Sequence, residues 1–204
     1  MSQKLWEKYP LLSTMSKLRA SRFNAAERLA KRYRWHSLSL VVFSIYVIAL
    51  SVTPAFFPDL SLSVRNVTGF VSIVSSVFVV ALSVYSAFSE DVVRGKYLHD
   101  NAKKVTNLYH QYKIDVLNHE NDSTHQLDTP RYEREYATIM DACPYNHDGI
   151  DYKSAMIQID GVKGRRKILM SLALASDMYF WPTLAITLPP LAVAVGILMF
   201  RSAI

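Results

Sequence analysis

Two long uncharged blocks dominate the pattern of hydrophobic and polar positions along the chain. They run from Trp35 to Pro58 and from Asn66 to Ser89, and each holds 24 residues without Asp, Glu, Lys or Arg. At about 1.5 Å of rise per helical residue, each block exceeds the roughly 30 Å hydrocarbon core of a bilayer. Residues 58–65 can form a turn but are too few for a folded domain. The pattern therefore predicts a transmembrane helical hairpin.

A third apolar region, Ile168–Phe200, is interrupted only by Asp177. Because burying a carboxylate at mid-membrane costs roughly 2.5 to 3.5 kcal/mol on insertion scales, we expect the span to run from Met178 to Phe200, with Asp177 at the cytoplasmic edge. An aromatic group should sit at the membrane interface: Tyr179, Phe180 and Trp181. Prolines interrupt this helix at three positions, Pro182, Pro189 and Pro190, and the last two should kink it near mid-depth.

The polar segments also show helical spacing of apolar residues. Residues Trp6–Tyr33 read as a basic amphipathic helix, which either lies on lipid headgroups or packs on a neighbouring subunit. The second span should continue as a cytoplasmic helix from Glu90 to about Asn118, with a possible kink at Gly95.

A polar loop, 118–128, should follow. A helix capped by Asp128 or Thr129 should end before Pro144, and Pro144–Tyr152 should form a turn, after which Asp151 can cap a helix toward Ile159. The fold class is therefore an all-α membrane protein in four segments: a basic cytoplasmic helix (1–34), the two-span hairpin (35–89), a cytoplasmic helical region (90–167) and a C-terminal transmembrane segment (168–204).

The net charge of +6 is concentrated at the N-terminus. Residues 1–34 carry nine Lys or Arg against two acidic residues, whereas residues 89–167 are balanced, with twelve basic and thirteen acidic residues. A basic arm beside a first span predicts a cytoplasmic N-terminus, an external turn and a multi-pass inner-membrane protein in contact with anionic lipid. This location favours lipid over nucleic acid as its partner. The basic run before the third region, Lys163, Arg165, Arg166 and Lys167, predicts the same orientation.

Small and hydroxyl residues form a seam on the second span, with spacings of three and four residues that keep them on one helix face: Gly69, Ser72, Ser76, Val79, Ser83 and Ser86. On the first span Ser37, Ser44 and Ser51 repeat at seven residues. One interpretation is close helix packing, with each hydroxyl bonded to the carbonyl one turn earlier. The other is that, in an oligomer, these residues line a wet pathway. The spacing leaves both open.

Signs of catalysis are missing from the sequence. No His pairs with Ser or Cys in a nucleophile motif, and the six glycines are too dispersed for a phosphate-binding loop. His147, Asp148 and Asp151 lack the spacing of a zinc or calcium site, and capping or turn roles fit them better. Cys143 has no second cysteine to pair with. We therefore expect no enzymatic activity, metal or other cofactor.

The order of these features resembles the SLATT family of bacterial membrane effectors, which have two or three spans. The resemblance rests on the close-coupled hairpin and on three segments: RASRFNAAERLAKRYRWHSLSL (19–40), KYLHDNAKKVTNLYHQY (96–112) and EREYATIMDACPYNHDGIDY (133–152). The third apolar region looks like the branch of the family with a C-terminal extension. Asn146, His147, Asp151 and Tyr152 match the late motif of the family, and the resemblance implies a shared cytoplasmic fold feature there.

The resemblance implies a pore-forming or membrane-disrupting effector that arrests or kills a phage-infected cell. In this hypothesis the protein is a homo-oligomer, and its cytoplasmic helices gate the spans in response to a sensor, such as a reverse transcriptase or a cyclic-nucleotide system. The alternative is a membrane-anchored binding module that restrains or recruits such a partner. Its motivation is a set of tyrosines that suits either a protein contact or an ordinary core: Tyr97, Tyr109, Tyr112, Tyr132, Tyr136, Tyr145 and Tyr152.

Overall fold

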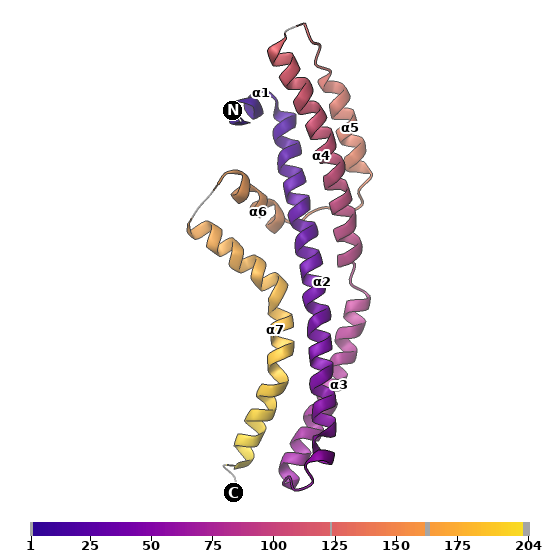
Figure 1. Ribbon diagram of the computed structural model, residues 1–204, viewed down its shortest axis with the longest axis vertical. Coiled ribbons are helices and arrows are strands. Elements are labelled where there is room, and N and C mark those ends of the chain that lie inside the picture. The colour runs from indigo at the N-terminus through magenta and orange to yellow at the C-terminus, as the bar shows by residue number, and fades with distance from the viewer. Residues whose placement is uncertain (1, 123, 162–163, 202–204) are drawn as a thin grey trace. The chain divides into compact units, whose positions relative to one another are not determined.

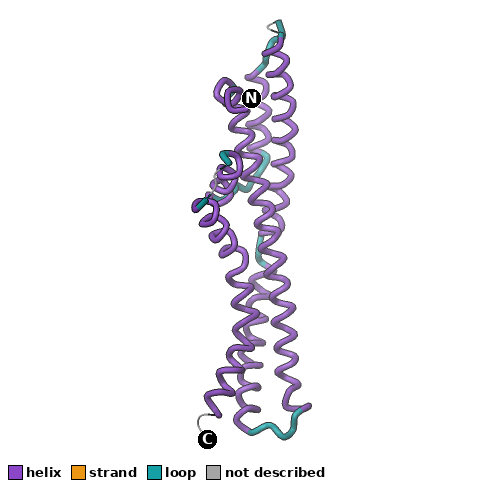
Figure 2. Tube along the Cα trace, turned by 60° about the vertical axis from the view of Figure 1, so that its left-hand side comes forward, coloured by secondary structure: helices purple, strands orange, loops and turns teal. Residues whose placement is uncertain are grey.

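The chain folds into helices joined by short loops in the computed structural model, which describes residues 2–122, 124–161 and 164–201 (Figures 1 and 2). Within these ranges there is no strand, so the all-α class is confirmed. The helices are α1 (Ser2–Lys8), α2 (Pro10–Phe56), α3 (Leu62–Ala87), α4 (Asp91–Asn121), α5 (Thr129–Asp141), α6 (Gly149–Ile159) and α7 (Arg165–Arg201).

Two compact units divide these helices between them. Met1–Ala30 and Asp91–Leu174 form one, which we call the polar unit. Lys31–Glu90 and Ala175–Ile204 form the other, which we call the span unit. Helix α2 contributes its first 21 residues, Pro10 to Ala30, to the polar unit and the rest to the span unit.

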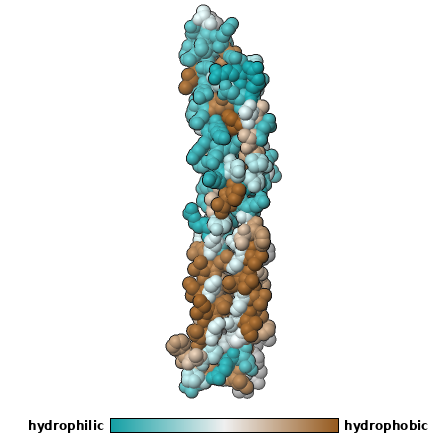
Figure 3. Space-filling model, turned by 90° about the vertical axis from the view of Figure 1, so that its right-hand side faces the viewer, coloured by the Kyte–Doolittle hydropathy of each residue, from teal (hydrophilic) through white to brown (hydrophobic). Residues whose placement is uncertain are grey.

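The span unit contains the predicted hairpin, made of the second part of α2 and all of α3. Two helical stretches, within Pro10–Phe56 and Leu62–Asn121, are long and apolar enough to cross a membrane, and the bent pair Arg165–Phe180 and Pro182–Leu188 makes a third if it is one span. Hydrophobic side chains gather on the surface of this unit, while hydrophilic ones cover most of the polar unit (Figure 3). In the turn, the Arg65 guanidinium donates to the Pro58 carbonyl at 2.8 Å.

The start of the α7 part of the span unit lies beside the start of the α2 part. Asp177 pairs with Arg32 at 3.6 Å, and the rings of Trp35 and Tyr179 meet edge to face with centroids 5.2 Å apart. The predicted aromatic group thus contacts α2 through Tyr179. The side chain of Trp181 lies outside the described residues, as does Lys163 of the basic run.

The polar unit has a core built from α2, α4 and α5. Leu12 and Met15 of α2 pack with Val105 and Tyr112 of α4 and with Tyr132 of α5. A second cluster joins α2 to α4 through three small or apolar residues of α2 and one of α4: Ala25, Ala26, Leu29 and Leu98. The polar unit therefore has a core of buried apolar side chains in mutual contact, as a water-exposed helical domain does.

The structure contradicts the expectation that the N-terminal helix lies on lipid headgroups. Leu12, Met15 and Leu29 are fully buried, so the chain itself covers the apolar face of this helix. Among the predicted tyrosines, Tyr109, Tyr112 and Tyr132 are buried in the same core. These three therefore act as core residues.

A single helix does not connect the second span to the segment after it, as the sequence had predicted. Helix α3 ends at Ala87, and α4 begins at Asp91. Glu90 and Asp91 are acidic residues at the start of α4, where negative charge is favourable. The helix without a break is α2, which the sequence had suggested as two elements.

Two further local predictions need correction. Helix α4 runs through Gly95 without a break, and a Cβ added there would lie 3.6 Å from the Ala26 carbonyl oxygen. The cap of α6 is Asp148, not Asp151, so the preceding turn ends one residue before Gly149. Helix α7 bends by 49° between Arg165–Phe180 and Pro182–Leu188, next to Pro182, which is one of the three prolines predicted to interrupt it. The predicted limits of α5 are confirmed: Asp128 caps this helix, which ends at Asp141, before Pro144.

Candidate functional site

The hydroxyl seam of α3 splits into two columns in the structure. Ser72, Val79 and Ser86, seven residues apart, are buried or half-buried against the chain's own helices. Ser76 and Ser83 are exposed, and Gly69, seven residues before Ser76, has open space where a Cβ would be. One column therefore packs inside the chain, and the other lies on the surface of the span unit.

Several serine hydroxyls of the two spans bond within the span unit. Four of them donate to the carbonyl one turn earlier, at 2.7 to 2.8 Å: Ser44, Ser51, Ser76 and Ser83. The hydroxyls of Ser51 and Ser72 also lie 2.7 Å apart and join α2 to α3. Such bonding lets a hydroxyl sit at a lipid-facing or helix-facing position without an unsatisfied polar group.

Thr68 and Ser75 complete the buried face of α3, and sequence reasoning missed both. The signal was present, because a second series with spacings of four and three runs alongside the predicted one: Thr68, Ser72, Ser75, Val79, Leu82 and Ser86. The two series share three residues. Without the partner helix, spacing alone could not say which series faces it.

The late motif forms an ion-pair network inside the polar unit. Asp151, fully buried, accepts from Arg28 of α2 through both oxygens, at 2.8 Å from Nε and 3.0 Å from Nη2. Arg28 itself is 4% exposed. A bidentate pair of this kind satisfies both charges and fixes the N-terminus of α6 against α2.

Asp148 extends the network to α4. Its two oxygens accept from Arg28 at 2.5 Å and from Arg94 at 2.7 Å. Arg94 also donates to the Asn146 carbonyl at 2.7 Å. The Asp148 amide donates to Asp151 at 3.1 Å, as in a capping box. Burial acts to raise the pKa of Asp148, but the hydrogen bonds from Arg94 and Arg28 outweigh it and hold the pKa below its usual value.

His147 and Tyr152, the other motif residues, stack with ring centroids 6.2 Å apart. Burial, together with the nearby charge of Arg22, lowers the pKa of His147, while Asp151 and Asp148 act in the opposite direction. The motif residues therefore lie together around the start of α6. Their partners Arg28 and Arg94 were missed, because a basic residue on a polar helix carries no mark of its partner in the fold.

Arg22 is a second buried arginine of the polar unit, 2% exposed. Its guanidinium donates to the Asn101 side-chain oxygen, and the Asn101 amide donates to the Ile139 carbonyl at 2.6 Å. Desolvation lowers the pKa of Arg22. No group of three or more His, Cys, Asp or Glu able to hold a metal occurs among residues 2–122, 124–161 and 164–201.

The fold and the two sites define an all-α membrane protein, in which a two-span hairpin is joined to a helical polar unit. The family model described as "SMODS and SLOG-associating 2TM effector domain family 5" matches residues 7–196. The chain belongs to this family of membrane effector domains, as its sequence resemblance had implied. Neither a curated protein nor a solved structure matches the chain.

Proposed function

We propose that the protein is an oligomeric effector of a bacterial antiphage system that opens or disrupts the inner membrane of an infected cell. The observation that carries this proposal is the exposed column of Gly69, Ser76 and Ser83 on α3. Small residues on an otherwise apolar surface allow a helix of a second copy to approach closely. When the helices shift, the hydroxyls in such a contact can leave the packed helix surface and contact water instead.

The proposed topology places the N-terminus and the polar unit in the cytoplasm. The basic residues before the first span, against the single Arg65 in the turn, support this orientation. The third crossing by α7 runs in the same direction as the first. The contact between Asp177 and Arg32 supports it, because it holds the carboxylate beside a cation at the proposed cytoplasmic edge.

In this proposal the polar unit receives the signal. A sensor, such as a reverse transcriptase or a cyclic-nucleotide system, binds one arrangement of its helices better than another and so shifts the equilibrium of the spans. Helix α2 supports this role, since it runs without a break from the core around Leu12 into the first span. Catalysis, a cofactor and nucleic-acid binding have no part in the proposal.

Dye release from liposomes tests the conducting role of the exposed column. The full chain is reconstituted with its activating partner, and Ser76→Leu/Ser83→Leu is compared with Val77→Leu/Ala81→Leu, which alters exposed positions on another side of the same helix. The proposal predicts release by the wild type and by the control, and a loss of at least tenfold in the serine variant. Equal release by all three proteins would show that this column is not the conduit.

A membrane-anchored binding module is the second candidate. Tyr97 and Tyr152, 48% and 44% exposed, favour it, because exposed tyrosines suit a protein contact. Exchanging α3 and the span part of α2 for unrelated apolar helices separates the candidates. Protection against phage retained by the exchanged protein supports the binding module, and protection lost supports the pore.

A further inference from the structure

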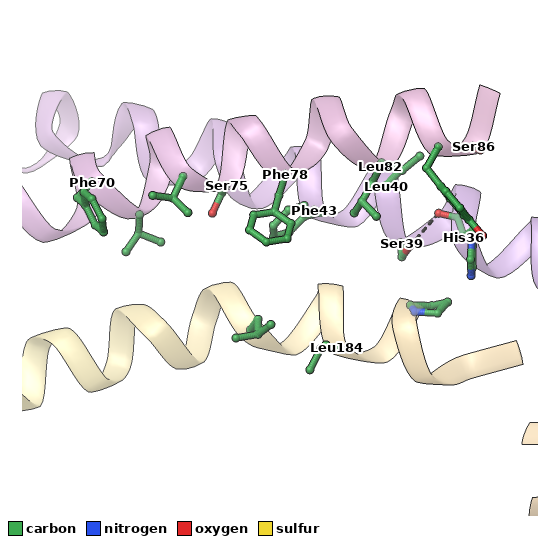
Figure 4. A pocket seen from close by; sticks show the side chains of 15 residues that line it. His36, Ser39, Leu40, Phe43, Phe70, Ser75, Phe78, Leu82, Ser86 and Leu184 are labelled. Carbon is green, nitrogen blue, oxygen red and sulfur yellow. Dashed lines mark hydrogen bonds between the residues drawn. The ribbon is translucent and has the colours of Figure 1, made fainter. Parts of the chain in front are cut away.

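A cavity of about 530 Å³ lies inside the span unit, between α2, α3 and α7 (Figure 4). Its walls include Phe43 of α2, Phe78 of α3 and Leu184 of α7. The volume falls in the range of small-molecule sites, roughly 300 to 1,000 Å³. Because the cavity is formed by the apolar stretches of α2 and α3, its surroundings are lipid and not water.

The polarity of the cavity changes along its length. His36 and Ser39 of α2 and Ser86 of α3 lie at one end, whereas Phe70 lies at the other (Figure 4). Arg32 and Asp177 pair one helical turn before His36, on the same side of α2. The lining at one end therefore offers an imidazole and hydroxyl groups next to this ion pair, and the remainder offers mainly hydrocarbon. This is the distribution of an amphiphile site.

The cavity is elongated along α3. Its lining residues on α3 run from Phe70 to Ser86, which is about 24 Å at 1.5 Å of rise per residue. A thin linear molecule lying along α3 would contact this whole lining, from the aromatic end at Phe70 to the hydroxyl end at Ser86.

We propose that the cavity binds one acyl chain of a membrane phospholipid, with the headgroup at the end marked by Arg32 and His36. Acyl chains are the thin apolar molecules available at this depth, and the basic residues of this edge suit an anionic headgroup. The proposal uses the third crossing by α7 but needs neither a pore nor an oligomer. The bound lipid would contact both α7 and the hairpin. The packing of α7 would then depend on which lipids the membrane contains.

Native mass spectrometry of the full chain tests the site. The protein is delipidated in mild detergent and titrated with palmitoyl-oleoyl phosphatidylglycerol. Ser75→Trp and Leu184→Trp fill the cavity from two different helices, and Val77→Trp places the same ring on the exposed face of α3 as the matched control. Circular dichroism selects the variants that keep the helical content of the wild type. Leu184, at the rim and 36% exposed, tolerates the larger ring even if Ser75 does not.

The proposal predicts one saturable lipid per chain in the wild type and in Val77→Trp, and binding at least tenfold weaker in each folded cavity variant. Lipid that binds without saturation, or equally to all variants, would overturn the proposal, because it would show only an annular lipid layer around the protein. Loss of an oligomer in the cavity variants, with lipid binding unchanged, would also overturn it and assign the cavity to contact between copies. This experiment measures lipid binding and not dye release. A negative result would therefore reject the lipid site without rejecting the proposed function, and a negative dye-release result would not reject the lipid site.

Discussion

The polar unit and the span unit place the same kinds of side chain in opposite positions. In the polar unit, Leu12, Met15 and Leu29 are fully buried. In the span unit, Ile48 and Ile73 are 63% and 68% exposed. A soluble domain of this size would not expose so much aliphatic surface. The difference shows that one unit folds against water and the other against lipid.

Polar groups follow the same division. The polar unit buries charges but pairs them across helices, as Arg28 does with Asp151. The hairpin blocks 35–58 and 66–89 hold no Asp, Glu, Lys or Arg, and the hydroxyls of Ser76 and Ser83 bond to a carbonyl of their own helix. Stability should therefore depend on ion pairs in one unit and on side-chain size in the other.

The largest effect is expected from Arg28→Ala. It leaves the Asp151 carboxylate buried without its partner, which should cost about 3 to 5 kcal/mol. Urea or thermal unfolding in detergent, followed by near-ultraviolet circular dichroism of the tyrosines, measures the loss. Lys8→Ala removes the exposed pair with Glu120 and should change stability far less. Equal losses would show that burial of the network has no energetic weight.

Ser72→Leu should come next, because it overfills the contact between α2 and α3 where Ser72 meets Ser51. Overpacking of this kind costs about 1 to 3 kcal/mol. Ser76→Leu makes the same change four residues later on the exposed side and should cost little in the unoligomerised chain. Thermal aggregation in detergent compares the two. A reversed order would mean that the two columns are assigned to the wrong faces.

A smaller effect should appear with pH. The pKa of Asp148 is lower in the folded protein than in the unfolded chain, so its contribution is complete above the unfolded value, about 3.9, and is lost as pH falls through the folded value. Unfolding measured from pH 6 to pH 3 should show this loss below about pH 4. Asp148→Asn should flatten that part of the profile. The side chain is 45% exposed, which keeps the effect modest.

Gly95→Ala should have the smallest effect and the opposite sign. A Cβ at this position would make ordinary contact with Leu29 at 3.6 Å, and alanine favours a helix by up to about 1 kcal/mol over glycine. Unchanged or slightly raised stability is expected from the same unfolding measurement. A clear destabilisation would mean that α2 and α4 approach more closely at Gly95 than the structure shows.

Local patterns predicted the helical class, the hairpin and the limits of α5, because each depends on neighbours in the chain. The cap at Asp128 is an example. Long-range partners were out of reach. Arg28 looks like any other basic residue of the arm until α6 brings Asp148 and Asp151 beside it. The choice between Ser75 and Ser76 on α3 likewise needs the position of α2, which no spacing contains.

Cysteine accessibility tests most directly whether the hairpin crosses the membrane, with its turn outside and the polar unit inside the cell. In a Cys143→Ser background, single cysteines replace Asp59 in the turn and Asp122 after α4, and intact spheroplasts are treated with a membrane-impermeant maleimide. The account predicts labelling of Asp59→Cys in intact cells and of Asp122→Cys only after permeabilisation. Labelling of both positions from outside, or protection of the turn, would contradict it.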